Sequence, residues 1–252
     1  MKMDSHLIKA LALSKGASLV GIANVERFEG APPGHGPADF VPGAKSVVVI
    51  GVRLLPAVVE WTRLFRRSQI MTGDVRRLVA QDHVYMRCAY HIINDRLNDI
   101  ALDVAYALQD AGHETIFLPA TYSHEAEIMR KVPGFLAPFS HRHAAVRAGL
   151  GGFGLSNLVV TPEYGPRIRF TSVITAASLQ ADPLLMDRVC PGQTCGVCVR
   201  ECKVSALVPR TDASGIRANL DMPSCVDKEA CLGAHGEVGC TGTCLRVCPI
   251  GL

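Results

Sequence analysis

Nine of the ten cysteines in this chain of 252 residues lie between Cys190 and Cys248, and Cys88 alone lies outside that segment. In a reducing compartment such a density of thiols rarely means disulfides and usually means bound metal. A disulfide framework would require export, yet the sequence MKMDSHLIKA at the start shows no secretory signal. The cysteines therefore predict a carboxyl-terminal segment that folds around metal.

The cysteines of this segment form two arrays in tandem. The first array is Cys190-x4-Cys195-x2-Cys198-x3-Cys202. The second array contains Cys225 and Cys231 and ends in Cys240-x3-Cys244-x3-Cys248-Pro249. Bacterial two-cluster ferredoxins use C-x2-C-x2-C-x3-C-P, in which the fourth Cys of each run crosses to the other cluster. The arrays, although two of their spacings are wider, predict two [4Fe–4S] clusters.

Crossed ligation divides the thiols into two sets, and the fourth thiolate of each run is expected at the start of a helix. One cluster is assigned to Cys190, Cys195, Cys198 and Cys248. The other is assigned to Cys202, Cys225, Cys240 and Cys244, with Cys231 as a spare or a substitute for Cys225. Zinc is the alternative metal, because four Cys ligands in CxxC pairs suffice to hold it. The x3 spacings and the final Cys-Pro favour iron–sulfur.

Charge and hydrophobicity are those of an ordinary globular protein, with a formal net charge of +3 and 48% hydrophobic residues. So small a charge does not demand nucleic acid as a partner. No run approaches the roughly 18 apolar residues of a membrane span. We expect a cytoplasmic protein that does not associate with a membrane.

Hydrophobic periodicity predicts helices and strands without a repeating βαβ rhythm. Helices are expected over residues 5–15, 57–70, 74–112 with a break near 81–84, 123–131 and 140–148. Strands are expected over 17–23, 45–54, 114–118, 157–161 and 167–176, and residues 30–42 read as a loop. This mixture predicts an α+β sandwich over a largely antiparallel sheet in residues 1–184, followed by the cluster domain in 185–252. Arg167 and Arg169 alternate with apolar residues and are expected on a solvated strand face, unless the ligand lies there.

Several short segments resemble the epoxyqueuosine reductase family, which is related to the reductive dehalogenases. They are AVRAGLGGFG at 145–154, Asn157, TPEYG at 161–165 and LDMPSC at 220–225, and the resemblance covers roughly residues 40 to 252. It implies a nitroreductase-like α/β sandwich of the cobalamin-binding type, followed by a small bis-[4Fe–4S] ferredoxin-like domain. It also implies that the clusters deliver electrons one at a time to a base-off corrinoid.

The resemblance places the corrinoid near the glycine run Gly149, Leu150, Gly151, Gly152 and Gly154. Arg142 and Arg147 would suit a phosphate of that cofactor. The run also matches the dinucleotide fingerprint GxGxxG, but that fingerprint follows a strand and opens a helix. Here the run follows a helical stretch and opens a strand, so the dinucleotide reading fails. The alternative is a tight turn that binds no ligand.

The sequence departs from the family at the proton donor. Aligned on Pro138, Phe135 stands where the family has an Asp and His141 where it has a Glu. Imidazole donates a proton near neutral pH, so His141 and His143 are the candidate replacements. The alternative is a basic turn that packs against the corrinoid.

The chain ends directly after the last cluster ligand, where the family continues into a helical-repeat region that helps to hold tRNA. We therefore expect either a shortened relative or a truncated chain, and tRNA is an unlikely partner.

The leading hypothesis is a cobalamin-dependent iron–sulfur reductase that receives electrons from an external low-potential donor of the ferredoxin or flavodoxin type. Its substrate would be a small molecule or a corrinoid protein. The first alternative is an electron-transfer protein or corrinoid-reducing activator with no substrate of its own, which the missing Asp favours. The second is a flavin-dependent reductase on the same sandwich.

Overall fold

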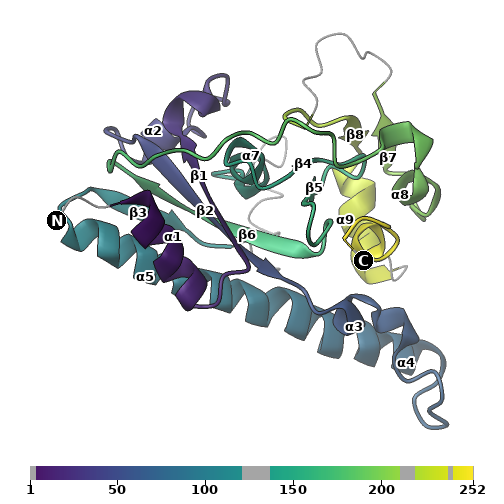
Figure 1. Ribbon diagram of the computed structural model, residues 1–252. Coiled ribbons are helices and arrows are strands. Elements are labelled where there is room, and N and C mark those ends of the chain that lie inside the picture. Colours follow the sequence, from purple (N-terminus) through teal and green to yellow (C-terminus); the bar gives the residue numbers. More distant parts are fainter. Residues whose placement is uncertain (1–3, 121–136, 211–218, 238–240, 252) are drawn as a thin grey trace. The chain divides into compact units, whose positions relative to one another are not determined.

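Figure 1 shows a computed structural model of the chain, which describes residues 4–120, 137–210, 219–237 and 241–251. The chain divides into two compact units, and each is built from three separate stretches. The first unit comprises Met1–Val52, Asn94–Gly151 and Arg169–Met186. The second comprises Arg53–Ile93, Gly152–Ile168 and Asp187–Leu252. None of the described helices has both the length and the apolar composition that a membrane crossing requires.

A four-stranded sheet forms the centre of the first unit. Its strand order is β1-β2-β6-β3, with β1 at Leu19–Asn24, β2 at Ser46–Arg53, β6 at Ile168–Thr175 and β3 at Thr115–Leu118. β1 pairs antiparallel with β2, and β3 pairs antiparallel with β6. These strands lie where the sequence predicts them, and the mixed α and β architecture with antiparallel pairing is confirmed.

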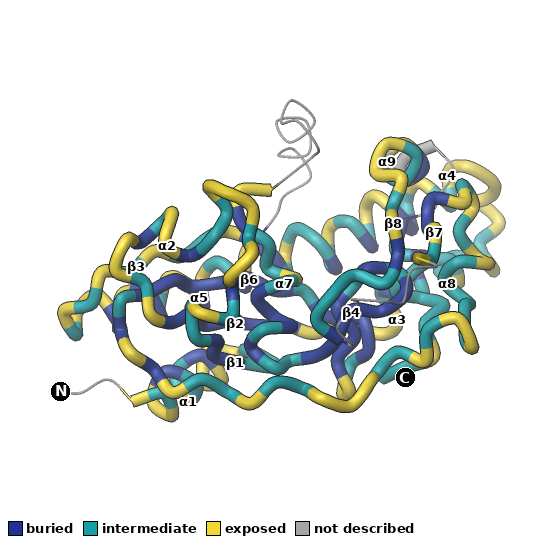
Figure 2. The backbone as a smooth tube through the Cα atoms, turned by 90° about the horizontal axis from the view of Figure 1, so that it is seen from above, coloured by how far each residue is buried: buried dark blue, intermediate teal, exposed yellow. Residues whose placement is uncertain are grey.

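The two inner strands are buried along almost their whole length, as expected where both faces of a sheet are covered. In β2 every residue from Ser46 to Val52 is buried, and in β6 only Arg169 is not fully buried. Figure 2 shows these strands among the buried segments of the chain. Burying a side chain of this size stabilises the fold by about 1.5–3 kcal/mol, so the sheet supplies a large share of the core.

Two helices lie together against this sheet. α1 (Ser5–Ser14) begins at Asp4, whose side chain accepts a hydrogen bond from the backbone N–H of His6, and it ends before Gly16 with φ +101°. α5 (Ile92–Asp110) runs beside it, and Lys15 Nζ lies 3.1 Å from an Asp103 carboxylate oxygen (Figure 1). The predicted helix over residues 5–15 is confirmed.

The second unit has its own apolar cluster. Its buried members are Leu54, Val59, Trp61, Ala80, Tyr85 and Ala89. The predicted helix over residues 57–70 is wrong, because the chain forms only α3 (Pro56–Val59) and the 3₁₀ turn η2 (Trp61–Arg63). The cause is a tertiary contact, since Trp61 is buried and its indole N–H donates to the carbonyl of Thr241 at 2.9 Å.

The long predicted helix over residues 74–112 is present without the expected break. α4 (Gly73–Leu78) passes into η3 (Val79–His91), which is wound as a π-helix, and then into α5. A π-wound segment holds more residues per turn, which shifts the register of the buried face without breaking the helix.

The remaining elements are short. Two of them, η1 (Val25–Phe28) and α2 (Pro37–Phe40), precede β2, and α2 lies in the predicted loop 30–42. The others are α7 (His141–Arg147), β4 (Gly152–Phe153), β5 (Val159–Val160), η5 (Gly192–Thr194), α8 (Val197–Arg200), β7 (Leu207–Pro209), β8 (Ser224–Val226), α9 (Lys228–Glu237) and α10 (Thr243–Arg246). The helix predicted over 123–131 lies outside the described residues.

Candidate iron–sulfur site

One hollow in the second unit is walled by cysteines. Its lining includes Cys190, Cys195, Cys198, Cys244 and Cys248, and it encloses about 370 Å³ of empty space, part of it open to solvent. The other lining residues are Gly, Pro, Ser and aliphatic residues. A thiol-rich wall without carboxylates suits iron–sulfur chemistry rather than a hard cation such as Mg²⁺.

The four thiols assigned to the first cluster line this hollow together. Burial raises the pKa of Cys198 to about 11, and the neighbouring Cys190 and Cys248 thiolates act in the same direction. Burial also raises the pKa of Cys248, with Cys190 and Cys195 contributing. Cys248 thus comes from the far end of the cysteine segment to the thiols of the first array, as crossed ligation requires.

Backbone N–H groups point at some of these sulfurs. Gly192 N–H donates to Cys190 Sγ at 3.4 Å, and Ala206 N–H donates to Cys202 Sγ at 3.3 Å. Hydrogen bonds to cluster sulfurs are one of the means by which a protein sets a cluster's reduction potential.

The two arrays are built on the same local plan. Gly196 precedes α8 with φ +55°, and Gly242 precedes α10 with φ +72°. A left-handed residue lets the chain reverse sharply before a one-turn helix, and glycine adopts it without steric cost. The prediction that the fourth cysteine opens a helix is wrong, since Cys202 and Cys248 follow α8 and α10. Each of these helices is a single turn that ends before it reaches the fourth cysteine of its array.

The second set of predicted ligands is described only in part. Cys225 is exposed on β8, Cys202 is half-buried after α8, and Cys240 lies outside the described residues. Cys244 lies on α10 and also lines the hollow of the first set. Cys231 and Cys88 are half-buried, on α9 and η3. Within the described parts of the chain, no three His, Cys, Asp or Glu side chains converge closely enough to hold a single metal ion.

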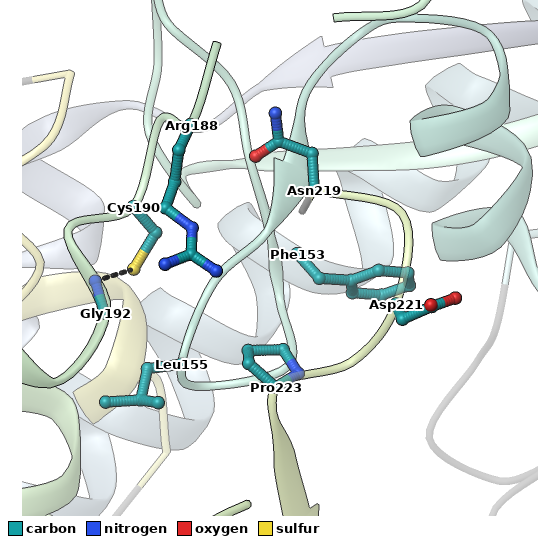
Figure 3. A pocket seen from close by; sticks show the side chains of 8 residues that line it. All are labelled: Phe153, Leu155, Arg188, Cys190, Gly192, Asn219, Asp221 and Pro223. Atoms are coloured by element: carbon teal, nitrogen blue, oxygen red, sulfur yellow. Dashed lines mark hydrogen bonds between the residues drawn. The ribbon is translucent and has the colours of Figure 1, made fainter. Parts of the chain in front are cut away.

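A smaller hollow adjoins the first one at Cys190. It is lined by Phe153, Leu155, Arg188, Cys190, Gly192, Asn219, Asp221 and Pro223, and the side chain of Arg188 extends into it (Figure 3). Phe153 N–H donates to the Asn219 carbonyl at 2.9 Å, and Asn157 Nδ2 donates to the Ser224 carbonyl at 2.6 Å. These hydrogen bonds hold the segment between the two cysteine arrays against residues 153–157.

A loop from Thr161 to Arg167 holds the last ligand. The Arg167 guanidinium donates to the carbonyls of Leu245 at 2.8 Å and Cys248 at 2.9 Å, and also to that of Ile250. The expectation of a solvated face at Arg167 is wrong, because this residue is 4% exposed. Arg169 is half-buried and donates to Asn94 Oδ1 at 2.7 Å. The alternating pattern could not reveal that the partners of Arg167 lie about eighty residues away.

The glycine run forms a helix-to-strand turn, as predicted, between α7 and β4. The atoms that lie close to its glycines belong to the chain itself. A Cβ on Gly149 (φ +73°) would lie 2.0 Å from the Pro183 carbonyl oxygen, and one on Gly152 would lie 2.3 Å from Asn219 Oδ1. One on Gly154 would lie 2.6 Å from a methyl group of Val160. Packing within the protein accounts for these glycines, so they do not by themselves indicate a corrinoid.

We expect Gly149→Ala to destabilise the protein more than Gly34→Ala does. Both glycines have positive φ, +73° and +81°, but a Cβ on Gly34 would have none of the described atoms within 4 Å. Each variant bears the left-handed cost of about 1–2 kcal/mol, and Gly149→Ala adds about 1–3 kcal/mol of overpacking. Thermal unfolding of the protein without added corrinoid measures the difference. Equal melting temperatures would contradict this packing and would indicate instead that Gly149 leaves room for a ligand.

The basic residues near this turn are held by contacts inside the first unit. Arg147 Nε donates to the Arg27 carbonyl at 2.6 Å, and its guanidinium lies 5.5 Å from the centre of the Phe28 ring. Arg142, by contrast, is exposed. Contacts within the chain thus involve both Nε and the guanidinium face of Arg147, one of the two arginines predicted for a cofactor phosphate. Phe135 lies outside the described residues.

The two candidate proton donors stand at the start of α7. His143 Nδ1 lies 2.7 Å from Ser140 Oγ. His141 Nε2 lies 3.1 Å from the Pro119 carbonyl, and its Nδ1 lies 3.0 Å from Ser172 Oγ. A carbonyl only accepts, so Nε2 carries the hydrogen and the Ser172 hydroxyl donates to Nδ1. Burial lowers the pKa of His141 to about 4, which keeps the ring neutral at pH 7.

Because the pKa of His141 falls from 6.5 in the unfolded chain to about 4 in the folded protein, acid destabilises the fold. The unfolded state takes up the proton first, so this contribution is complete above pH 6.5 and is lost as the pH falls towards 4. We expect the free energy of unfolding to decline over that window, and His141→Gln to flatten the decline. Denaturant unfolding at a series of pH values measures it. An identical slope in the variant would contradict the buried neutral ring.

Comparison with known proteins gives a consistent result. No profile of a known protein family matches the chain. Over 115 residues it is 36% identical to the tetrachloroethene reductive dehalogenase of Sulfurospirillum multivorans, a match that covers 42% of this chain and 22% of that protein. The catabolic reductive dehalogenase NpRdhA, solved with 3-bromo-4-hydroxybenzoic acid, superposes with a TM-score of 0.63 at 19% identity, covering 97% of this chain and 31% of that one. The epoxyqueuosine reductase from Streptococcus thermophilus superposes with a TM-score of 0.58 at 17% identity, covering 99% and 66%.

The chain has the fold of the reductive dehalogenases and epoxyqueuosine reductases. The resemblance inferred from the glycine run and the two arrays is thereby confirmed. The chain spans less than a quarter of the dehalogenase from Sulfurospirillum multivorans and about a third of NpRdhA. The superposition with NpRdhA extends over 97% of this chain.

Proposed function

We propose that the chain is an iron–sulfur oxidoreductase of this fold, with a [4Fe–4S] cluster held by Cys190, Cys195, Cys198 and Cys248. The observation that carries the proposal is the hollow around which these thiols meet. Bound there, the cluster would accept and release single electrons. A second cluster is proposed for Cys202, Cys225, Cys240 and Cys244, which completes a bis-[4Fe–4S] ferredoxin-like part in addition to a nitroreductase-like sandwich.

The chain's own residues make the site suitable for such a cofactor. The left-handed glycines before α8 and α10 reverse the chain beside the thiols, and backbone N–H groups donate to the sulfurs of Cys190 and Cys202. Thiols persist in a reducing compartment such as the cytoplasm. An external low-potential donor of the ferredoxin or flavodoxin type would supply the electrons.

For the electron acceptor we propose a corrinoid that reduces a small molecule. The support is structural similarity. A solved reductive dehalogenase that superposes on this chain with a TM-score of 0.63, at 18% identity, is described in connection with B12-dependent dehalogenation. The residues predicted to cradle the corrinoid do not add to that support, because Gly149, Gly152 and Arg147 are taken up by contacts within the chain. The flavin alternative has no support among these neighbours.

The second candidate function is an electron-transfer protein or corrinoid-reducing activator. It is favoured by the state of His141, which is neutral and bonded at both ring nitrogens, so that this histidine does not offer a proton to a substrate. An activator needs no general acid, because it passes electrons to the cobalt of a partner protein.

Anaerobic preparation with iron, sulfide and corrinoid analysis tests both candidates. We expect a brown protein with about two clusters per chain. Free cobalamin added to it should change its visible spectrum if the chain holds the corrinoid itself. A spectrum that stays that of free cobalamin, together with reduction of a partner's corrinoid, would select the activator. A colourless protein that contains zinc would overturn the iron–sulfur proposal.

A further inference from the structure

Arg167 is a buried cation fastened to the segment that carries the last cluster ligand. Its guanidinium donates to three backbone carbonyls between Leu245 and Ile250, and one of them belongs to Cys248. Its backbone is fixed as well, because Leu54 N–H donates to its carbonyl at 2.8 Å and its own N–H donates to Tyr164 at 3.0 Å. This is the contact pattern of a positioning residue.

The charge of Arg167 is not balanced by an adjacent acid. In the part of the chain that the structure describes, no carboxylate lies within ion-pair distance of it. Glu60 interacts with it electrostatically, but the Glu60 carboxylate is paired with Arg63 at 3.1 Å. Arg167 also bonds the backbone of Cys248 and interacts electrostatically with its sulfur, which carries a negative charge only when it binds iron as a thiolate. A buried guanidinium without an adjacent counter-charge is costly, so this environment favours an anionic group bound by the segment that Arg167 contacts.

A [4Fe–4S] cluster with four thiolate ligands is such an anion, because the thiolates outweigh the charge of its iron–sulfide core. Reduction adds one electron, and therefore one more negative charge, beside the cation. A fixed positive charge nearby stabilises the reduced form more than the oxidised form, which raises the reduction potential.

We propose that Arg167 positions Cys248 and raises the reduction potential of the cluster held by Cys190, Cys195, Cys198 and Cys248. The inference rests on the proposed iron–sulfur function. It assigns to one side chain two effects that separate in experiment. The hydrogen bonds hold the ligand segment in place, and the charge sets how readily the cluster accepts an electron.

The test is a redox titration of the reconstituted protein followed by electron paramagnetic resonance, with iron content measured on the same samples. Arg167→Gln removes the charge but keeps a hydrogen-bond donor, and we expect its cluster to titrate at a more negative potential. Arg167→Lys keeps the charge but donates hydrogen bonds with a different geometry. We expect its reduction potential to shift in the same direction by a smaller amount. The control is Arg169→Gln, since Arg169 bonds Asn94 in the first unit. We expect no shift from it.

The proposal fails if Arg167→Gln assembles its clusters and titrates at the wild-type potential. Should Arg167→Gln not assemble, Arg167→Met decides, because it also removes the charge, and a wild-type potential there overturns the proposal. A wild-type protein with no iron–sulfur signal would refute the proposed function instead. The two failures are thus distinguishable in one set of samples.

Discussion

Replacing Cys248 by Ser is expected to remove one of the two clusters, so that iron and sulfide per chain fall by about half. Cys248 lines the same hollow as Cys190 and Cys195 although it belongs to the second array, and we propose it as the ligand that ties the two arrays together. A serine oxygen at this place cannot replace a thiolate as a soft ligand for iron. Iron and sulfide analysis after anaerobic reconstitution gives the stoichiometry.

Cys88→Ser is the matched control, because Cys88 lies on η3 and does not line the hollow. We expect it to keep the full complement of iron. Cys244 needs its own variant, since it also lines the hollow. If Cys248→Ser keeps both clusters while Cys244→Ser loses the first one, the crossing ligand is Cys244 and the assignment is wrong.

The sheet could be predicted because its signal is local. β2 is an apolar, β-branched run from Val47 to Val52, and such a run needs no knowledge of the rest of the fold to be recognised as a buried strand. The helix predicted over 57–70 failed for the opposite reason. Its periodicity is real, but Trp61 is fixed by the carbonyl of Thr241, which lies far along the sequence. Periodicity read over a short stretch of sequence cannot include that partner, which lies 180 residues away.

The candidate site divides in the same way. Cysteine spacing is a local signal, and the four thiols that it assigns to the first cluster line one hollow, together with Cys244, which it assigns to the second. The role of Arg167 was missed because its burial depends on the loop that ends the chain. The glycine run was read as a cofactor cradle because a close approach at Gly149 looks the same in sequence whether the neighbour is a ligand or the Pro183 carbonyl. Only the three-dimensional contact distinguishes the two.

Gly165 is the position at which we expect the smallest chemical change to have the largest effect on the site. It has φ +54°, and a Cβ there would lie 1.9 Å from the carbonyl oxygen of Ile250, which is backbone. On the facing segment a Cβ on Gly251 would lie 2.1 Å from Gly165 N. The two segments thus approach through two glycines, and neither can give way without moving the chain that carries Cys248.

Gly165→Ala should therefore displace the ligand segment although every thiol is still present. We expect iron per chain to fall nearly as far as in Cys248→Ser, and the melting temperature to fall with it. Gly73→Ala is the control, because Gly73 has almost the same φ, +52°, and a Cβ there would meet none of the described atoms within 4 Å. It bears only the left-handed cost of about 1–2 kcal/mol and should keep both clusters. If the two alanine variants retain the same iron, close docking of the 161–167 loop on the last ligand segment is not what places Cys248.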